Sequence, residues 1–326
     1  SRSEFDALNR PIEINVPGGT IYQPKYNESN FLDSLKVKIR GQGAFQTFLE
    51  EQDYDAKGQR QFAKYGNGTI TEYFYDPKTY RLSNLLTRLN EANANSQAIQ
   101  NIKYTFDPIG NITQIRDDAQ QTHFFKNVVV NPENKYEYDA VYQLIEANGR
   151  EHAGLGNNSQ SSHLDLPFNS PLPHLNNLNA VRLYKEKYEY DDCGNILRIQ
   201  HLADNANWTR RYKYEFDDVA NNNTNRLKAT SDAGDADGVF SLNYTHDLHG
   251  NMTSMPHLST PNSLIWNFLS QLKEIDLGSG GKAFYVYGNN GNRVRKVVER
   301  PGGKIKETIY LGKIEIYRER QGNNAP

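Results

Sequence analysis

The strongest constraint on the fold is a short motif that recurs along the chain: an aromatic residue, an aspartate and, in many copies, a glycine three residues later. The copy at 188–199 reads YEYDDCGNILRI, and the copy at 104–115 reads YTFDPIGNITQI. A last copy at 285–297 carries Gly288 in place of the aspartate. Copies lie 21 to 52 residues apart, so the chain is an array of repeats with insertions. The motif aspartates are Asp6, Asp55, Asp76, Asp107, Asp139, Asp191, Asp217 and Asp247.

The spacing within the motif has a physical basis in turn geometry. Aspartate at the first position and glycine at the fourth are preferences of a type I turn. The aspartate carboxylate can accept a hydrogen bond from the backbone N–H two residues on. The glycine can adopt the left-handed conformation that closes such a turn with a bulge. Each copy is therefore predicted to be a β-hairpin; the glycines concerned are Gly58, Gly110, Gly194, Gly250 and Gly291, mostly followed by Asn111, Asn195, Asn251 or Asn292.

The residues around the turn predict how the hairpins associate. Tyr-x-Tyr or Tyr-x-Phe before the aspartate places two aromatic side chains on one face of a strand. A single hairpin is marginally stable in water, so consecutive hairpins should pair side by side. Glycine-rich turns at 17–20, 66–69 and 301–304 are expected at the opposite hairpin ends. The predicted fold is all-β over residues 1–326, an antiparallel sheet of consecutive β-hairpins.

Four segments depart from the repeat. Residues 151–182 are rich in proline, asparagine and serine, and a connection of that length is expected to be an insertion over the sheet or across an opening. Residues 97–102 and 121–130 are expected to be shorter spacers. Apolar residues at helical spacing predict a short helix over 82–97.

Composition narrows the classes of function. The chain has 21 tyrosines and 14 phenylalanines at a mean hydropathy of −0.81, which suits strands with one buried and one wet face. The formal net charge is −2 and no long run of one sign occurs, so no nucleic-acid partner is expected. One cysteine excludes an intrachain disulfide framework. No apolar stretch approaches the roughly 20 residues of a membrane helix, so no membrane span is expected.

Two clusters were weighed as metal sites. Asp232, Asp235 and Asp237 precede Gly238, and carboxylates at short spacing can wrap a calcium ion. The cluster lacks the distal glutamate of an EF-hand, and the alternative interpretation is a solvated acidic turn. His246, His249 and His257 lie close in sequence, but a repeat turn separates the first two, so their imidazoles are expected to diverge. No cofactor is predicted.

Three further residue types were weighed as sites. Cys193 occupies a turn position that Ile109 fills in another copy, which favours a bystander over a nucleophile. The repeat aspartates are not expected to form a glycosidase pair, because a residue present in nearly every copy serves the copy's structure. Trp208 and Trp266 could stack on sugars. The segment around Trp266 is also a candidate degenerate repeat, in which Leu269-Ser270 stands in for the aspartate turn.

The motif resembles the YD repeat of the RHS-repeat family along most of the chain. The order of NWTRRYKYEF (207–216), HGNMTSMPHL (249–258), FYVYGNNGNRVRKVVE (284–299) and IYLGKIEIYRE (309–319) is most similar to the B/C-type component of bacterial insecticidal toxin complexes and its SpvB-linked relatives. The resemblance implies a sheet that curves as part of a hollow shell. In that family the shell encloses a toxic C-terminal segment, which an aspartyl autoproteolytic site releases.

This resemblance implies the partners and the location of the protein. We expect a fragment of the shell wall without catalysis of its own, because the sequence ends at QGNNAP (321–326), before the end of the repeat core where the family carries its Asp-Pro-x-Gly motif. The implied partners are the remaining parts of the shell, the enclosed toxin segment and a translocator component, and the implied location is secreted or extracellular, from a bacterium. The alternative function is a cell-surface or carbohydrate-binding module with a glycan partner.

Overall fold

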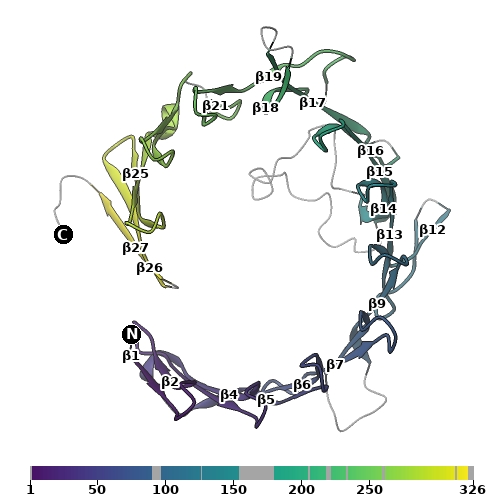
Figure 1. Cartoon of the computed structure of the whole chain (residues 1–326), viewed down its shortest axis with the longest axis vertical. Coiled ribbons are helices and arrows are strands. Elements are labelled where there is room, and N and C mark those ends of the chain that lie inside the picture. Colours follow the sequence, from purple (N-terminus) through teal and green to yellow (C-terminus); the bar gives the residue numbers. More distant parts are fainter. Residues whose placement is uncertain are drawn as a thin grey trace. The chain divides into compact units, whose positions relative to one another are not determined.

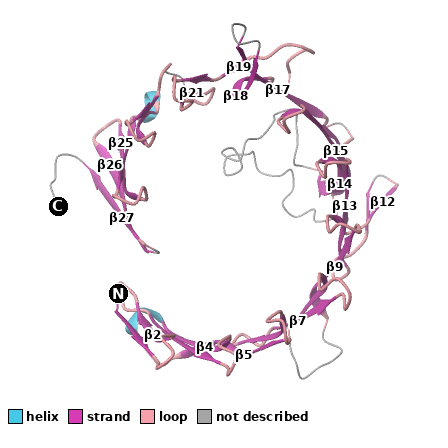
Figure 2. Cartoon of the chain, in the orientation of Figure 1, coloured by secondary structure: helices cyan, strands magenta, loops and turns pink. Residues whose placement is uncertain are grey.

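The structure is a computed structural model that describes residues 2–89, 97–125, 127–153, 180–204, 206–217, 222–232, 234–258, 261–312 and 314–321. Nearly all regular structure in these ranges is β-strand (Figure 2). Their helical elements are two short 3-10 turns, η1 (Ile39–Gly41) and η2 (Gly278–Gly280). Over the same ranges no helix has the length and apolar character needed to cross a membrane. The predicted all-β class is confirmed.

The strands before residue 154 follow the order of the repeats. They are β1 (Arg2–Phe5), β2 (Pro11–Asn15), β3 (Ile21–Tyr26), β4 (Leu32–Lys38), β5 (Gln46–Tyr54), β6 (Arg60–Tyr65), β7 (Ile70–Tyr75), β8 (Leu82–Arg88), β9 (Ala98–Phe106), β10 (Ile112–Asp117), β11 (His123–Phe125), β12 (Val128–Val130), β13 (Glu133–Tyr138) and β14 (Leu144–His152).

Each strand from β1 to β9 pairs antiparallel with the next strand in the chain (Figure 1). β10 then pairs with β13, and β13 pairs with β14. The hairpin of β11 and β12 forms its own two-stranded sheet between them in sequence. The predicted antiparallel sheet of consecutive hairpins is therefore confirmed.

The strands after residue 180 continue the pattern. β16 to β19 pair in sequence, β20 pairs with β21, and β22 to β27 form a six-stranded sheet. These strands are β15 (Val181–Tyr190), β16 (Ile196–Leu202), β17 (Trp208–Asp217), β18 (Asn222–Thr230), β19 (Leu242–Asn243), β20 (Thr245–His246), β21 (Met252–Ser254), β22 (Leu264–Trp266), β23 (Leu272–Asp276), β24 (Lys282–Tyr287), β25 (Arg293–Arg300), β26 (Lys304–Leu311) and β27 (Ile314–Gln321).

The described residues divide into two compact units. The first contains the described residues up to 153 together with 180–186 and 202–204. The second contains 187–201 and the described residues from 206 onward. Both units are built from the same kind of hairpin, so each is described below by its own turns and strands.

Large side chains are rarely buried in either unit. Seven of the twelve buried hydrophobic residues among the described ones are alanines, and Val130 is the largest hydrophobic side chain less than 2% exposed. Most tyrosines and isoleucines on the strands are only half-buried. Burial of large apolar side chains therefore supplies less of the stability than in a layered domain. Strand pairing and contacts between neighbouring hairpins must supply more.

The structure corrects three expectations about the segments between repeats. The helix predicted over 82–97 is wrong for residues 82–88, which form β8, while residues 90–96 lie outside the described part. Residues 97–102 are not a spacer, because β9 begins at Ala98. Residues 121–130 contain the additional hairpin of β11 and β12. Both faces of β8 are half-buried, so its sequence lacks the alternation that marks a strand with one wet face.

Residues 154–179, which make up most of the predicted insertion, lie outside the described residues. The residues on either side of them belong to strands. The N–H of Ala153 donates a hydrogen bond to the carbonyl of Ala180 at 2.7 Å. The side chain of Arg182 is 5% exposed and its Nη2 lies 2.7 Å from Glu151 Oε1. The described residues on either side of the segment, Ala153 and Ala180, therefore lie side by side.

Candidate functional site: the edge of aspartate turns

Each described aspartate turn is organised by its carboxylate. In the Asp191 turn, the N–H of Asp191 donates to the carbonyl of Asn195, and the N–H of Gly194 donates to the carbonyl of Asp191. Asp191 Oδ1 accepts the N–H groups of Cys193 and Asn195 at 3.0 and 2.8 Å. Asp191 Oδ2 accepts Nδ2 of Asn195 at 2.8 Å. The one carboxylate thus accepts three donors of its turn.

The carboxylate takes part in the turn in the same way in seven of the eight motif aspartates, and the side chain of Asp217 lies outside the described part. The Asp76 turn is one residue longer, because the N–H of Asp76 donates to the carbonyl of Arg81. Each of the seven accepts the backbone N–H two residues on, which confirms the predicted turn. The predicted glycines all have positive φ, from 77° to 121°. The seven pairs are Asp6–Leu8, Asp55–Lys57, Asp76–Lys78, Asp107–Ile109, Asp139–Val141, Asp191–Cys193 and Asp247–His249.

These hydrogen bonds stabilise the ionised carboxylate. In Asp191 and Asp247 the side-chain amide of the asparagine four residues on is the largest cause, and it lowers the pKa against the opposing effect of desolvation. In Asp107 desolvation is the largest single effect, but hydrogen bonds from Gly110 and Asn111 outweigh it and the pKa is again lowered. The carboxylates therefore stay charged and stay within their own turns. An acid with a low pKa is a poor proton donor near neutral pH.

Two further turns use asparagine in place of the aspartate. Asn27 Oδ1 accepts the N–H groups of Ser29 and Phe31, and Asn267 Oδ1 accepts those of Leu269 and Gln271. The fourth positions carry Asn30 and Ser270, with φ of 68° and 55°. The degenerate repeat predicted around Trp266 is confirmed, with Asn267 in the aspartate position. The Asn27 turn was missed, although an aromatic residue before Asn-x-x-Asn was a readable signal.

Tyrosines on the strands connect each hairpin to the one before it. Their hydroxyls donate to the backbone carbonyl directly after the preceding turn, at 2.9 to 3.1 Å. The indole N–H of Trp266 makes the equivalent bond to Met252 at 2.7 Å. The five tyrosine bonds are Tyr26 to Pro11, Tyr54 to Leu32, Tyr75 to Arg60, Tyr138 to Ile112 and Tyr214 to Ile196.

The last residue of each turn makes a second connection, this time to the next hairpin. Arg10 Nη1 donates to Asn30 Oδ1 at 2.8 Å, and Gln59 Nε2 donates to the carbonyl of Tyr80 at 2.8 Å. Arg81 donates to the carbonyls of Asp107 and Ile109 at 3.1 and 2.6 Å.

Phe31 makes the corresponding contact by packing. Its ring stacks on Tyr54 at 4.7 Å and would lie 2.6 Å from a Cβ at Gly58. Together with the hydrogen bonds of Arg10, Gln59 and Arg81, this contact joins the turns from Asp6 to Asp107 into one connected edge.

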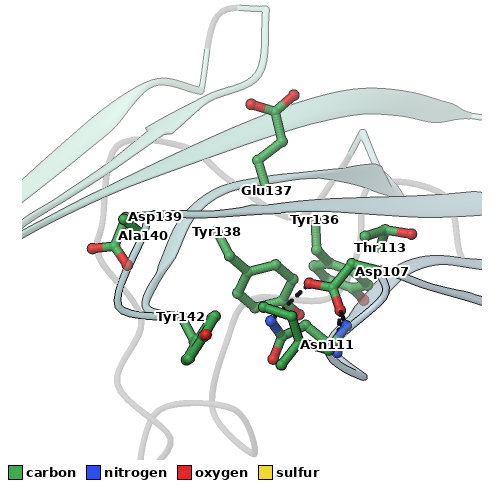
Figure 3. Close-up of a pocket in the computed structure, with 10 residues that line it drawn as sticks. Asp107, Asn111, Thr113, Tyr136, Glu137, Tyr138, Asp139, Ala140 and Tyr142 are labelled. Carbon is green, nitrogen blue, oxygen red and sulfur yellow. Dashed lines mark hydrogen bonds between the residues drawn. The ribbon is translucent and has the colours of Figure 1, made fainter.

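A shallow depression marks a change in this series. It has a volume of about 550 Å³ and lies between the Asp107 and Asp139 turns, where Tyr136, Tyr138 and Tyr142 line it (Figure 3). The Nδ2 of Asn111 donates to its own Asp107 at 2.8 Å. Glu137 points away from Tyr136 and Tyr138 (Figure 3). The carboxylate of Asp107 is already used by its turn, so the depression offers aromatic surface with few free polar groups.

In the acidic cluster considered for calcium binding, the carboxylate of the central residue, Asp235, already accepts hydrogen bonds from its own loop. Asp235 Oδ2 accepts the N–H of Asp232 at 2.8 Å and both the N–H and Oγ–H of Ser241, at 3.0 and 2.7 Å. Asp237 Oδ1 lies 2.7 Å from Nε of Arg211. Within the described ranges no group of three or more histidine, cysteine, aspartate or glutamate residues is placed to hold a metal ion. The solvated acidic turn and a calcium site at Asp232, Asp235 and Asp237 stay alternative interpretations.

The other sequence candidates lie apart from one another. The side chain of His246 is 7% exposed, with its Nδ1 3.7 Å from Glu215 Oε1. Cys193 is an exposed thiol at a turn tip, as expected. Trp208 stacks on His201 with ring centroids 5.2 Å apart. Trp266 is half-buried in its hydrogen bond to Met252, so both tryptophans already have partners.

The chain is similar to bacterial toxin subunits over almost its whole length. It is 32% identical to the toxin subunit YenC1 of Yersinia entomophaga over 94% of this chain and 30% of that protein. It is also 32% identical to the toxin subunit YenC2 of the same organism over 87% of this chain and 29% of that protein. The chain thus spans about a third of the length of the curated relatives it matches. No protein-family model matches the sequence.

Solved structures give the same result. TcdB2-TccC3 superposes with a TM-score of 0.78 at 30% identity, over 99% of this chain and 15% of that chain. The Photorhabdus luminescens Tc holotoxin pore superposes with a TM-score of 0.76 at 29% identity, over 98% of this chain and 14% of that chain. The resemblance to the RHS-repeat subunits of toxin complexes is confirmed.

Proposed function

We propose that this chain, as a relative of the C-type subunits of bacterial toxin complexes, is a stretch of the wall of a hollow shell that encloses a toxin polypeptide. Its partners are the rest of the shell, the enclosed segment and a translocator component, and its location is outside the bacterial cell. The observation that supports this role most directly is the set of links between turns in the stretch that matches the toxin subunits. These links join the turns from Asp6 to Asp107 in the first unit, and in the second unit Nδ2 of Asn251 donates to Oγ of Ser270 at 3.2 Å.

The structure of the repeat suits a wall. The hairpin that contains Tyr75 binds its predecessor through the tyrosine hydroxyl, and the hairpin that contains Gln59 binds its successor through this last residue of its turn. Contacts of this kind involve nearest neighbours, so such a sheet can be extended by adding hairpins without enlarging a core. A wall built in this way can enclose a large volume with a single layer of strands.

The proposed role includes no chemical step in this stretch. The carboxylates that recur along the chain are held by three or four hydrogen bonds in turns such as those of Asp107 and Asp191. A general acid needs a raised pKa, and theirs are lowered. The carbohydrate-binding alternative rests on Trp208 and Trp266, whose rings or N–H groups already contact His201 and Met252.

A chimera tests the proposal. This chain would replace the matching stretch of TcdB2-TccC3, a structure of which is also known without its hypervariable C-terminal region. We expect the chimera to elute as one particle and to leave that C-terminal region undigested by added protease, with unaltered TcdB2-TccC3 digested in parallel for comparison. A chimera carrying Gly281→Ala, which places a Cβ 1.8 Å from the carbonyl oxygen of Glu299, is the disrupted control. An intact particle whose C-terminal region is digested freely would contradict a containing wall.

A further inference from the structure

The six-stranded sheet of β22 to β27 carries a charge that the rest of its unit lacks. Between residues 282 and 321 the sequence has ten lysines and arginines against four glutamates, a formal charge of +6. Residues 206–281 have six basic against nine acidic residues, a formal charge of −3. The net charge of −2 for the whole chain conceals this division. Most of it lies on two adjacent strands, β25 and β26, which carry six basic against two acidic residues.

Four of these basic residues form one surface, here named the basic patch: Lys296, Arg300, Lys304 and Lys306. Arg300 lies directly opposite Lys304 in the β25–β26 ladder, and Val298 lies directly opposite Lys306. Residues directly opposite each other share a face of the sheet, as do residues two apart on one strand. The patch therefore occupies one face of β25 and β26, next to the turn at 301–303.

The charges of the basic patch are only partly balanced. Glu319 Oε2 lies 3.7 Å from Nζ of Lys306, and Glu319 also pairs with Lys304. The hydrogen bond from Lys304 is the largest cause that lowers the pKa of Glu319, to about 2. Within the described residues no acidic side chain lies within 4 Å of Lys296 or Arg300. One carboxylate thus faces four cations.

This arrangement lowers the stability of the hairpin itself. Like charges directly opposite on neighbouring strands repel, and Arg300 and Lys304 are such a pair. A glutamate at either position would have given a favourable cross-strand pair, as Arg318 and Glu307 do on the other face of β26 and β27. The repulsion within the patch lowers the stability of the chain, and an anionic partner that neutralises the patch would offset this cost.

We propose that the basic patch on β25 and β26 binds an extended acidic segment of a partner polypeptide. Acidic side chains two residues apart on an extended segment repeat at about 6.6 Å, the spacing of Lys304 and Lys306 along β26. A duplex nucleic acid fits less well, because it carries a charge about every 1.7 Å and is held by six to ten phosphate contacts, whereas the patch offers four cations in an acidic chain. The inference does not depend on the containing role proposed above.

Binding of a defined peptide tests the inference in the full chain. The probe is a fluorescein-labelled ten-residue peptide of alternating glutamate and threonine, compared with its glutamine–threonine counterpart by fluorescence anisotropy. We expect the acidic peptide alone to bind, with an affinity that falls as salt is added. The double variant Lys296→Gln, Arg300→Gln should weaken binding about tenfold, since it removes two ion pairs. The matched control is Lys25→Gln, Lys187→Gln, two exposed strand lysines outside the patch.

Each outcome decides the matter. Loss of binding in the patch variant with retention in the control supports the inference. Equal binding by all three proteins, or no binding by the unaltered chain, overturns it. Tighter binding of a labelled DNA duplex than of the acidic peptide would assign the patch to nucleic acid and overturn the polypeptide assignment. Arg300→Gln alone should also raise Tm, because it removes the repulsion from Lys304, and a lower Tm would contradict that explanation of the patch.

Discussion

The tyrosine bonds between hairpins make a quantitative prediction about Tyr138. Its hydroxyl donates to the carbonyl of Ile112 at 2.9 Å, between β13 and β10. A hydrogen bond of this kind contributes about 0.5–1.5 kcal/mol net to folding. Tyr138→Phe removes the hydroxyl and keeps the ring. We therefore expect the free energy of unfolding of the first unit to fall by about 1 kcal/mol.

The assay is urea unfolding followed by circular dichroism, with amide hydrogen exchange to locate the effect. The matched control is Tyr136→Phe, on the same strand and the same face, because within the described residues the Tyr136 hydroxyl makes no hydrogen bond. Exchange should accelerate at the amides of β10 and β13 and stay unchanged near β3, since hairpins of this kind contact nearest neighbours. Equal midpoints for Tyr138→Phe and Tyr136→Phe would refute the reasoning.

Phe106 allows the opposite substitution, in which a hydroxyl is added. This residue stands directly before Asp107, where Tyr75 and Tyr138 stand before their aspartates, and it has no hydroxyl to donate. The equivalent acceptor is the carbonyl of Leu82, the first residue after the Asp76 turn. Phe106→Tyr should therefore raise the free energy of unfolding by about 0.5–1 kcal/mol. An unchanged or lower value would show that this position is not equivalent to the others.

Four further predictions follow from the same structure. Hydrogen bonds lower the pKa of Asp191 below its unfolded value of 3.8, so the stability it contributes is present above that value and should be lost as pH falls below 4, as acid unfolding would show. Desolvation raises the pKa of Tyr212 above 10.0. The stability that Tyr212 contributes is therefore present below pH 10 and should be lost as pH rises further, and ultraviolet difference spectra would follow its ionisation. Gly281→Ala should destabilise the protein by about 2 kcal/mol or more, since φ is 93° and the Cβ meets a carbonyl oxygen. Millimolar calcium should leave Tm unchanged, because Asp235 already accepts hydrogen bonds from Ser241 and Asp237 pairs with Arg211; a rise in Tm that the double variant Asp235→Ala, Asp237→Ala abolishes would establish a calcium site instead.

The turns were the most predictable part of the fold because their chemistry is local. Aspartate, glycine and asparagine act within five consecutive residues, and a sequence shows all of them at once. The Asn27 turn was missed because the motif was defined by an aspartate. The side-chain oxygen Oδ1 of Asn27 makes the hydrogen bonds that an aspartate carboxylate makes in the other turns. Asparagine also tolerates the left-handed conformation, which Asn30 uses in place of glycine.

The strand β8 shows where sequence patterns lose information. Its residues LSNLLTR place leucines at 82, 85 and 86, a spacing that fits one face of a helix. A sheet with one buried and one wet face would have imposed alternation, but both faces of β8 are half-buried. The bonds between hairpins were unpredictable for another reason. Tyr75 and Arg60 are 15 residues apart, and their contact depends on the pairing of strands.

The turns also explain how copies of one repeat can present different side chains at their tips. The carboxylate, the glycine and the last residue of the turn fix the backbone, and the two residues at the tip make no contribution to that hydrogen bonding through their side chains. The tip can therefore hold Lys57, Ile109, Cys193 or His249 in different copies without changing the fold. In the second unit two tips carry Leu248 and Phe268, which are 96% and 93% exposed. The turn edge is thus a constant framework that presents variable side chains, which allows a sheet of similar hairpins to meet different neighbours along its length.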